Sequence, residues 1–423
     1  MTSRYRHRHR ARTGAALLAT AITLTGCTST ASEGSAEAAA ADTTTVERTA
    51  ALIPAAPGEP DPGEEFSTRP SDYPATAGDN GIGSIIESQR MAEFLVLPAE
   101  VDPALTEEYL DLTRPIFGPI PLAYLLADTD STIEQIGAET GIIAGFSTAR
   151  FTTDSRARMV HAVLRFRDAA GAGEAASQLH ERLLDPAVSG PTAAPHPLAT
   201  MPESLVHTVE TEFSRSVAAL TQHGHYLIYT FVDSPTDRAS WADQALEHAL
   251  ELQRPMIDRF PATAPSELRN LPVDIDDMLR RTLRYPDGAD GAQVPAVYGP
   301  RGAAHLLAQL STLDMFADTA ATHMARDATF VYRTDATDRA ETLFDRVVAQ
   351  IRDKNDDISV VSAAGPPGVP DARCFEVITP YSEGASCALL YDTYVAEIRT
   401  KTLTGAHQAT SAQYLIFQAT DTD

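Results

Sequence analysis

The residues with the clearest chemical role lie near the start of the chain, where Leu24, Thr25 and Gly26 precede Cys27. Before Cys27 come an arginine-rich tip and residues 14–25, which are apolar or small and carry no charge. This layout is typical of a secretory signal and is too short for a permanent membrane helix. Small residues before a cysteine form the bacterial lipobox, in which the thiol is acylated and the cysteine becomes the new N-terminus. We therefore expect a lipoprotein signal peptide over residues 1–26 and lipidation of Cys27.

Lipidation predicts a protein on the extracytoplasmic face of the cell membrane, attached through its N-terminal acyl chains. No run after Cys27 reaches the roughly 18 apolar residues that a membrane helix needs. The chain has 58 acidic against 33 basic residues and a formal net charge of −25. Nucleic acid is therefore not an expected partner, because binding to phosphates requires the opposite sign. Attachment to anionic lipid by charge is disfavoured for the same reason.

The two remaining cysteines, Cys374 and Cys387, predict one disulfide bond. Exported proteins meet an oxidising environment, in which an even number of cysteines indicates pairing. Two buried free thiols are the alternative. A redox pair prefers closer spacing, such as Cys-x-x-Cys. We expect a structural bridge that locks a hairpin and contributes roughly 3 kcal/mol in the chain-entropy model.

Motifs for catalysis are absent from the sequence. There is no Gly-x-Ser-x-Gly elbow, no Walker loop and no Gly-x-Gly-x-x-Gly after a predicted strand. His180 and Glu181 begin like a zinc-protease motif, but Leu184 stands where the second histidine should be. We therefore expect no enzymatic activity, no catalytic residues and no cofactor.

Two groups of residues could hold a metal ion, and in both the metal is the weaker interpretation. His223 and His225 lie on one predicted turn, but a site would need further ligands from elsewhere, which favours a polar turn. Asp274, Asp276 and Asp277 resemble the start of a calcium loop, but no glycine or glutamate follows at the required distance. We expect these acids to favour the N-terminus of a helix that includes residues 278–283, and we expect no metal site.

The lipobox is followed by a predicted disordered tether over residues 27–65. This stretch is rich in Ser, Thr, Ala and Pro and has too little apolar surface to offset its conformational entropy. Its reach as a flexible coil is roughly 30–40 Å. Two domains are expected after it, an N-terminal one over residues 66–264 and a C-terminal one over residues 265–423. With 43% hydrophobic residues, both can form a core.

The predicted fold class is α+β, with an antiparallel sheet covered by helices in each domain. Both halves show a β-α-β-β-α order, which suggests duplication of one unit, although two unrelated α+β layers would look alike. The only tryptophan, Trp241, is expected to pack in the core of the first half. In the first half we predict strand 159–166, a helix from Asp168 to residue 184, strands 216–220 and 226–232, and a helix from Asp237. In the second half we predict strand 329–333, a helix after Asp335, strands 374–378, 387–391 and 394–399, and a final helix over residues 406–417.

Residues 87–98 and 101–103 resemble the N-terminal signature of an actinobacterial lipoprotein family of unknown function, typical of Nocardia, Rhodococcus and mycobacterial relatives. The similarity continues through residues 298–307 and the paired cysteines, and it covers most of the chain from about residue 66. The resemblance implies export, acylation and a two-part α+β body. The family has no established activity, so no catalytic residues can be carried over.

These observations favour a non-enzymatic lipoprotein of the cell envelope that binds a lipid, a glycolipid or another small ligand outside the membrane. The alternative is a protein-interaction module or an accessory subunit of an envelope complex. The least favoured hypothesis is an unrecognised hydrolase. A binding protein should have an apolar cavity of several hundred Å³. An interaction module should expose a contiguous apolar patch, and a hydrolase should bring Ser, His and an acid together.

Overall fold

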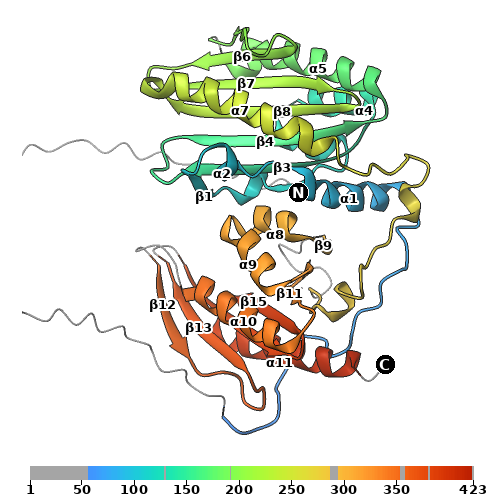
Figure 1. The fold of residues 1–423 in the computed structure, drawn as a ribbon, viewed down its shortest axis with the longest axis vertical. Helices are drawn as coiled ribbons and strands as arrows, with labels where there is room; N and C mark the ends of the chain where they lie inside the picture. Colours follow the sequence, from blue (N-terminus) through green and yellow to red (C-terminus); the bar gives the residue numbers. More distant parts are fainter. Residues whose placement is uncertain are drawn as a thin grey trace, which may run out of the picture. The chain divides into compact units, whose positions relative to one another are not determined.

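The computed structural model describes residues 56–127, 130–190, 192–285, 294–352, 358–379 and 382–421. Within these residues the chain forms two antiparallel sheets with helices packed against them (Figure 1). The predicted signal peptide, Cys27 and most of the predicted tether lie outside the described residues. The architecture confirms the predicted class of two α+β domains.

The first sheet belongs to the N-terminal half and has β3 and β4 beside the β7–β8 hairpin. Its helices are α1 (Asn80–Met91), α2 (Pro98–Val101), α3 (Pro119–Leu125), α4 (Thr132–Thr140), α5 (Ala169–Leu184), α6 (Pro186–Ser189) and α7 (Ala239–Ile257), with 3₁₀ turns η1 (Ala92–Phe94), η2 (Leu110–Leu112) and η3 (Thr236–Arg238). The strands lie in the order β1 (Leu105–Glu108), β3 (Ile142–Thr152), β4 (Arg158–Phe166), β8 (Tyr226–Pro235), β7 (Ser214–His223), β6 (Ser204–Glu210), β5 (Ala194–Pro195), with β2 (Arg114–Pro115) beside β3.

Both faces of this first sheet are buried. Successive side chains of a strand point to opposite faces, so Val163 packs in the cluster that includes α7, while Leu164 packs in the cluster that includes α5. Burial on both faces explains why β4 is apolar almost throughout rather than alternating. One face of the sheet is therefore covered by α7 and the other by α5. The pocket described below lies on the α5 face.

The second sheet repeats this plan in the C-terminal half. Its strands lie in the order β12 (Ser359–Ala363), β13 (Ala372–Ile378), β14 (Glu383–Tyr391), β15 (Tyr394–Thr400), β11 (Thr329–Arg333), β10 (His323–Arg326), β9 (Ala296–Tyr298). Helix α10 (Thr337–Arg352) and helix α11 (Leu403–Thr420) pack against different faces, because their buried residues fall in different clusters. The remaining elements are α8 (Pro300–Leu307), α9 (Ser311–Thr319), η4 (Leu268–Asn270) and η5 (Leu279–Arg281).

The two sheets share one strand order, and each has more strands than the predicted β-α-β-β-α unit. Counted along each sheet, β6-β7-β8-β4-β3 corresponds to β13-β14-β15-β11-β10, and α5 corresponds to α10. This agreement supports the proposed duplication. The prediction was incomplete because it omitted β1, β2, β3, β5 and β6 in the first half and β9, β10 and β12 in the second.

Strand β3 was not predicted from the sequence, and it contains Gly145 where it pairs with β4. A Cβ atom at this position would lie 2.7 Å from the carbonyl oxygen of Val163 on the neighbouring strand, so glycine permits the close approach. The strand is buried on both sides and mixes small, polar and aromatic residues, so it shows no alternation that would reveal it.

Two further predictions need correction. The helix expected over residues 278–283 is only the 3₁₀ turn η5, preceded by Asp276 and Asp277 with φ of 55° and 57°. Residues 56–65, assigned to the tether, are partly packed, since the Gly368 N–H donates to the Ala56 carbonyl oxygen at 3.2 Å. The folded part of the chain therefore begins before residue 66.

Residues of both halves contribute to one hydrophobic cluster. It contains Leu95 and Phe146 from the N-terminal half and Tyr298, Leu307 and Phe316 from the C-terminal half, all nearly inaccessible to solvent. Glu93 connects the halves further, because its carboxylate accepts hydrogen bonds from the N–H groups of residues 301 and 302 in the first turn of α8. The two sheets are thus joined by a common core.

Candidate functional site

A pocket lies on the α5 face of the first sheet, beside the last turn of α5. Its volume is about 270 Å³. The sheet contributes Val160, Ala218 and Tyr229, and Leu183 of α5 and Val188 of α6 complete the wall. The apolar lining follows from the strand pattern, because these sheet residues all point to the face that α5 covers. The other lining residues are Tyr109, Leu112, Leu125, Leu126, Ala127, Arg158, Ser189, His207, Val209, Ser216 and Phe231.

Two polar side chains in the lining determine what the pocket can recognise. The Nδ1 atom of His207 is buried and has no hydrogen-bond partner among the described residues. Burial, with a smaller effect from His180, lowers the pKa of His207 to about 4, so the imidazole is neutral at pH 7. Arg158 forms an ion pair, since its Nε lies 3.6 Å from the carboxylate of Asp233, but this Nε has no hydrogen-bond partner among the described residues. The pocket therefore suits a neutral, mostly apolar molecule with one hydrogen-bonding group.

The features expected of a hydrolase or of a protein-interaction module are weaker in the described structure. The shortest histidine–carboxylate contact there, 2.6 Å from His223 Nε2 to Asp258, includes no serine, and no hydrogen-bonded Ser-His-acid chain occurs among the described residues. Exposed large apolar side chains lie on several elements, among them Phe213 in the β6–β7 turn and the pair Ile120 and Tyr124 on α3. The pocket is accordingly the feature that best fits a binding role.

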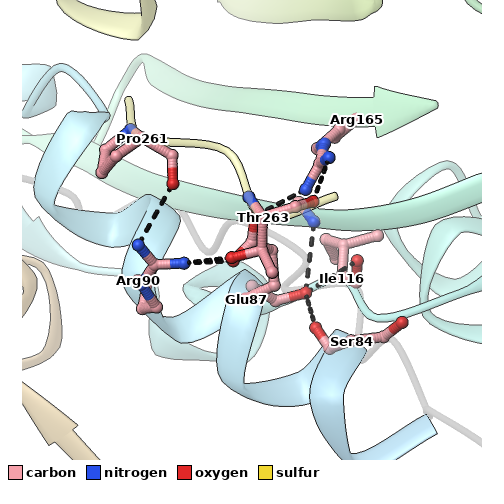
Figure 2. A network of polar contacts seen from close by, with 9 residues as sticks. Ser84, Glu87, Arg90, Ile116, Arg165, Pro261 and Thr263 are labelled. Carbon is pink, nitrogen blue, oxygen red and sulfur yellow. Dashed lines mark hydrogen bonds and ion pairs between the residues drawn. The ribbon is translucent and has the colours of Figure 1, made fainter. Parts of the chain in front are cut away.

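Glu87, on the segment that resembles a family signature, forms a buried polar network (Figure 2). Its carboxylate is fully buried and lies 2.5 Å from the guanidinium groups of both Arg90 and Arg165. Thr263 donates its backbone N–H to Glu87 at 2.8 Å and its hydroxyl at 3.0 Å. Arg165 in turn donates to the Thr263 carbonyl oxygen at 2.5 Å. The network fixes α1 against β4 and the segment after α7, and its carboxylate has a structural role.

The same signature segment is held by two buried histidines. Residues 94–96 bond to Gln253, which accepts from the Val96 N–H at 2.9 Å and donates to the Phe94 carbonyl oxygen at 2.8 Å. His161 Nε2 lies 2.9 Å from the same Gln253 oxygen, which fixes the ring as an Nε2–H donor. His305 Nε2 lies 3.2 Å from the Leu95 carbonyl oxygen. Burial lowers the pKa of His161 to about 4 and that of His305 well below its usual range, so both are neutral structural groups.

The structure contains the predicted disulfide between Cys374 and Cys387. The two residues are direct partners in the β13–β14 ladder, and both are buried. The bridge lies in the cluster that packs against α11. It joins the strands of one hairpin, as the spacing predicted, far from any catalytic arrangement among the described residues.

The weaker metal candidates are not assembled into a site. His223 contacts Asp258, whereas His225 stacks beside Tyr226 with ring centroids 4.1 Å apart. Asp274 accepts the N–H groups of Leu279 and Arg280 and so caps η5. No group of three or more His, Cys, Asp or Glu residues suited to a metal ion occurs in the described part of the chain.

His180 and Trp241 have structural surroundings. The His180 ring faces the His207 ring at 5.3 Å, and burial lowers the pKa of His180. Trp241 packs beside the shared core as predicted, and its indole N–H also donates to Asp102 at 2.6 Å. Among the described residues no helix is long and apolar enough to cross a membrane.

Sequence reasoning did not find the pocket residues. Val160, Ala218 and Tyr229 were assigned to strands, but nothing in their spacing shows that three strands and two helices leave space between them. The one available signal was His207, a histidine within an apolar strand, but residues 204–210 were assigned to no element in the prediction. The pocket depends on tertiary packing and not on a local motif.

Comparisons with known proteins identify a family of unknown function. A model described as the N-terminal domain of unknown function DUF7373 matches residues 74–273, and its C-terminal counterpart matches residues 278–419. The search of curated proteins gives no match. The extracellular domain of PknH from Mycobacterium tuberculosis is similar at 13% identity and a TM-score of 0.26, over 41% of this chain and 97% of that one. This likeness is too weak to support an argument.

The unknown function of the family agrees with the resemblance described above, while its membership among actinobacterial lipoproteins stays a prediction. The two models describe successive domains of one family and together match most of the chain. The protein therefore belongs to the DUF7373 family.

Proposed function

We propose that this protein is a non-enzymatic lipoprotein of the cell envelope that binds a small, mostly apolar molecule in the pocket beside α5. The observation that carries the proposal is an apolar cavity of about 270 Å³ whose lining includes His207, a buried histidine with one ring nitrogen that has no hydrogen-bond partner among the described residues. A buried polar atom without a partner costs free energy, and a ligand that bonds to it recovers that cost.

The size of the pocket limits the ligand. Sites for drug-sized molecules occupy roughly 300–1,000 Å³, so a volume of about 270 Å³ suits a small molecule and not a whole glycolipid. Arg158 is paired with Asp233, so the pocket does not present a free cation to an acid. The ligand class proposed is therefore a neutral compound with an apolar body and one hydroxyl, carbonyl or amide group.

The location proposed for this activity is the outer face of the cell membrane. It is supported by the lipobox at Cys27 and by the disulfide, which is a bond typical of exported proteins. Replacing Cys27 by Ala should abolish the incorporation of labelled fatty acid and release the protein from membranes. Continued labelling of the Cys27→Ala variant would contradict the lipobox interpretation.

The binding proposal is tested by titrating the purified protein with 1-naphthol and measuring heat release. We expect Ala218→Phe, which fills the floor of the pocket, to weaken binding by roughly tenfold or more. Val188→Trp fills the pocket from its half-buried wall and serves if Ala218→Phe does not fold. Phe213→Ala removes an exposed apolar side chain elsewhere and should leave the affinity unchanged. Equal affinity in the wild type and a folded pocket-filling variant would contradict the proposal.

A further inference from the structure

A second pocket is lined by two arginines that form no ion pair among the described residues, and its lining also includes the exposed Asp111. It has a volume of about 490 Å³ and lies between η2, β2 and α3 on one side and β9, α8 and β10 on the other. Arg114 of β2 and Arg326 of β10 both line it. In the described structure neither guanidinium has a carboxylate within 4.0 Å or a hydrogen-bond partner.

Acidic residues outnumber basic ones 58 to 33, so the chain has many carboxylates that could pair with arginines. Two arginines of the elements around the pocket do make hydrogen bonds. Arg301 makes two hydrogen bonds to Glu100, at 2.6 and 3.0 Å, and Arg150 donates to the Thr113 hydroxyl at 3.1 Å. Burial lowers the pKa of Arg326, which shows that its surroundings disfavour the unpaired charge. Arg114 and Arg326 are both half-buried. A charge partly removed from water without a partner is costly, and an anion that enters the pocket would reduce that cost.

The walls of this pocket favour a ligand with an apolar part. The Arg114 guanidinium lies 4.8 Å from the centroid of the Tyr124 ring, and Phe117 and Leu306 also line the space. Tyr124 and Ile120 lie four residues apart on α3, on one side of the helix, and are 52% and 68% exposed. Apolar surface therefore continues from the pocket onto α3.

We propose that this second pocket binds a small anion that carries a carboxylate or phosphate group on an apolar or aromatic body. Arginine presents a fork of N–H donors that matches the oxygens of both groups. Arg326 and Arg114 would bind the oxygens, while Tyr124, Phe117 and Leu306 would contact the body of the ligand. The site is distinct from the pocket beside α5, whose arginine is already paired.

The test is to titrate the purified protein separately with benzoate, phenyl phosphate and inorganic phosphate, and to follow binding by calorimetry. We expect one or both aromatic anions to bind more tightly than inorganic phosphate. Arg326→Met and Arg114→Met should each weaken that binding by roughly tenfold or more, as the loss of a charged hydrogen bond predicts. Arg259→Met, at an exposed position, should have no effect. Binding of 1-naphthol should be unchanged in every arginine variant, so the two proposals can fail separately.

A stability measurement separates a binding role from a structural one. Among the described residues Arg326 has no ion-pair or hydrogen-bond partner, and its guanidinium contacts only the Phe330 ring, at 5.9 Å. Arg326→Met should therefore unfold at the same temperature as the wild type or higher. Binding of the aromatic anions that is unaffected in a folded double variant of Arg114 and Arg326 would overturn the proposal. A wild type that binds neither anion at millimolar concentration, or an Arg326→Met variant that is strongly destabilised, would overturn it as well.

Discussion

The disulfide between Cys374 and Cys387 is expected to stabilise the folded protein. They face each other across the β13–β14 ladder and are buried under α11. The bond closes a short loop in the unfolded chain, so replacing Cys374 by Ala should lower the free energy of unfolding by about 3 kcal/mol. Denaturant unfolding of the variant and the wild type measures this difference.

The control for the disulfide is the same comparison in a reducing buffer. There the wild type should lose most of its advantage over Cys374→Ala, because both chains then lack the bond. A wild type and variant that unfold at the same denaturant concentration under oxidising conditions would show that the bond contributes nothing.

His161 gives the protein a dependence of stability on pH. Its pKa is lowered to about 4 by complete burial, whereas an unfolded histidine titrates near 6.5. Between these values the unfolded chain binds more protons than the folded one, so stability is full above about pH 6.5 and falls as the pH drops toward 4. His207, with a pKa of about 4, acts in the same direction.

The measurement is denaturant unfolding at pH 7 and pH 5 for the wild type, His161→Gln and His248→Gln. His161→Gln should lose about 1–2 kcal/mol less stability than the wild type between the two pH values. His248 is exposed on α7, so its variant should behave like the wild type. The account of His161 fails if the two variants show the same pH dependence.

At the scale of the element, Glu87 joins α1 to the first sheet. The carboxylate compensates two guanidinium groups and the Thr263 N–H, so Glu87→Gln leaves a buried positive charge with less compensation. Breaking a buried ion pair in this way costs about 3–5 kcal/mol. We expect Glu87→Gln to lower the free energy of unfolding by that amount, measured in denaturant.

Glu181→Gln is the matched control, because Glu181 is an exposed residue on α5. Surface changes of this kind usually alter stability by no more than about 0.5 kcal/mol. A loss in Glu87→Gln as small as that in Glu181→Gln would mean that the network does not hold α1 in place.

At the scale of the whole molecule, the shared hydrophobic core should make the two halves unfold together. Leu95 and Phe146 of one half lie in the same cluster as Tyr298 and Leu307 of the other. Calorimetry should therefore show a single transition. Glu87→Gln in the first half and Cys374→Ala in the second should both lower that one transition temperature. Two separate transitions, each shifted by only one variant, would contradict this expectation.

The same difference of scale explains what could be predicted from the sequence. Local patterns identified β4, α5 and the disulfide, because an apolar β-branched run, the Asp168 cap and cysteine spacing are properties of neighbouring residues. Strand β3 was not predicted because it mixes small, polar and aromatic residues and, being buried on both faces, shows no alternation. Neither pocket was predicted. The pocket beside α5 combines separate strands and helices of the first half. The second pocket combines residues such as Arg114 and Arg326, which are far apart in sequence and meet only through the packing of the two halves.

The central claim is that the pocket beside α5 holds a small neutral ligand. Native mass spectrometry of the full-length protein, extracted from its membrane in a mild detergent, tests this most directly. The account predicts an additional small mass that disappears on denaturation and that is absent from a folded Ala218→Phe variant prepared in the same way. The same bound mass in the wild type and in Ala218→Phe would contradict it.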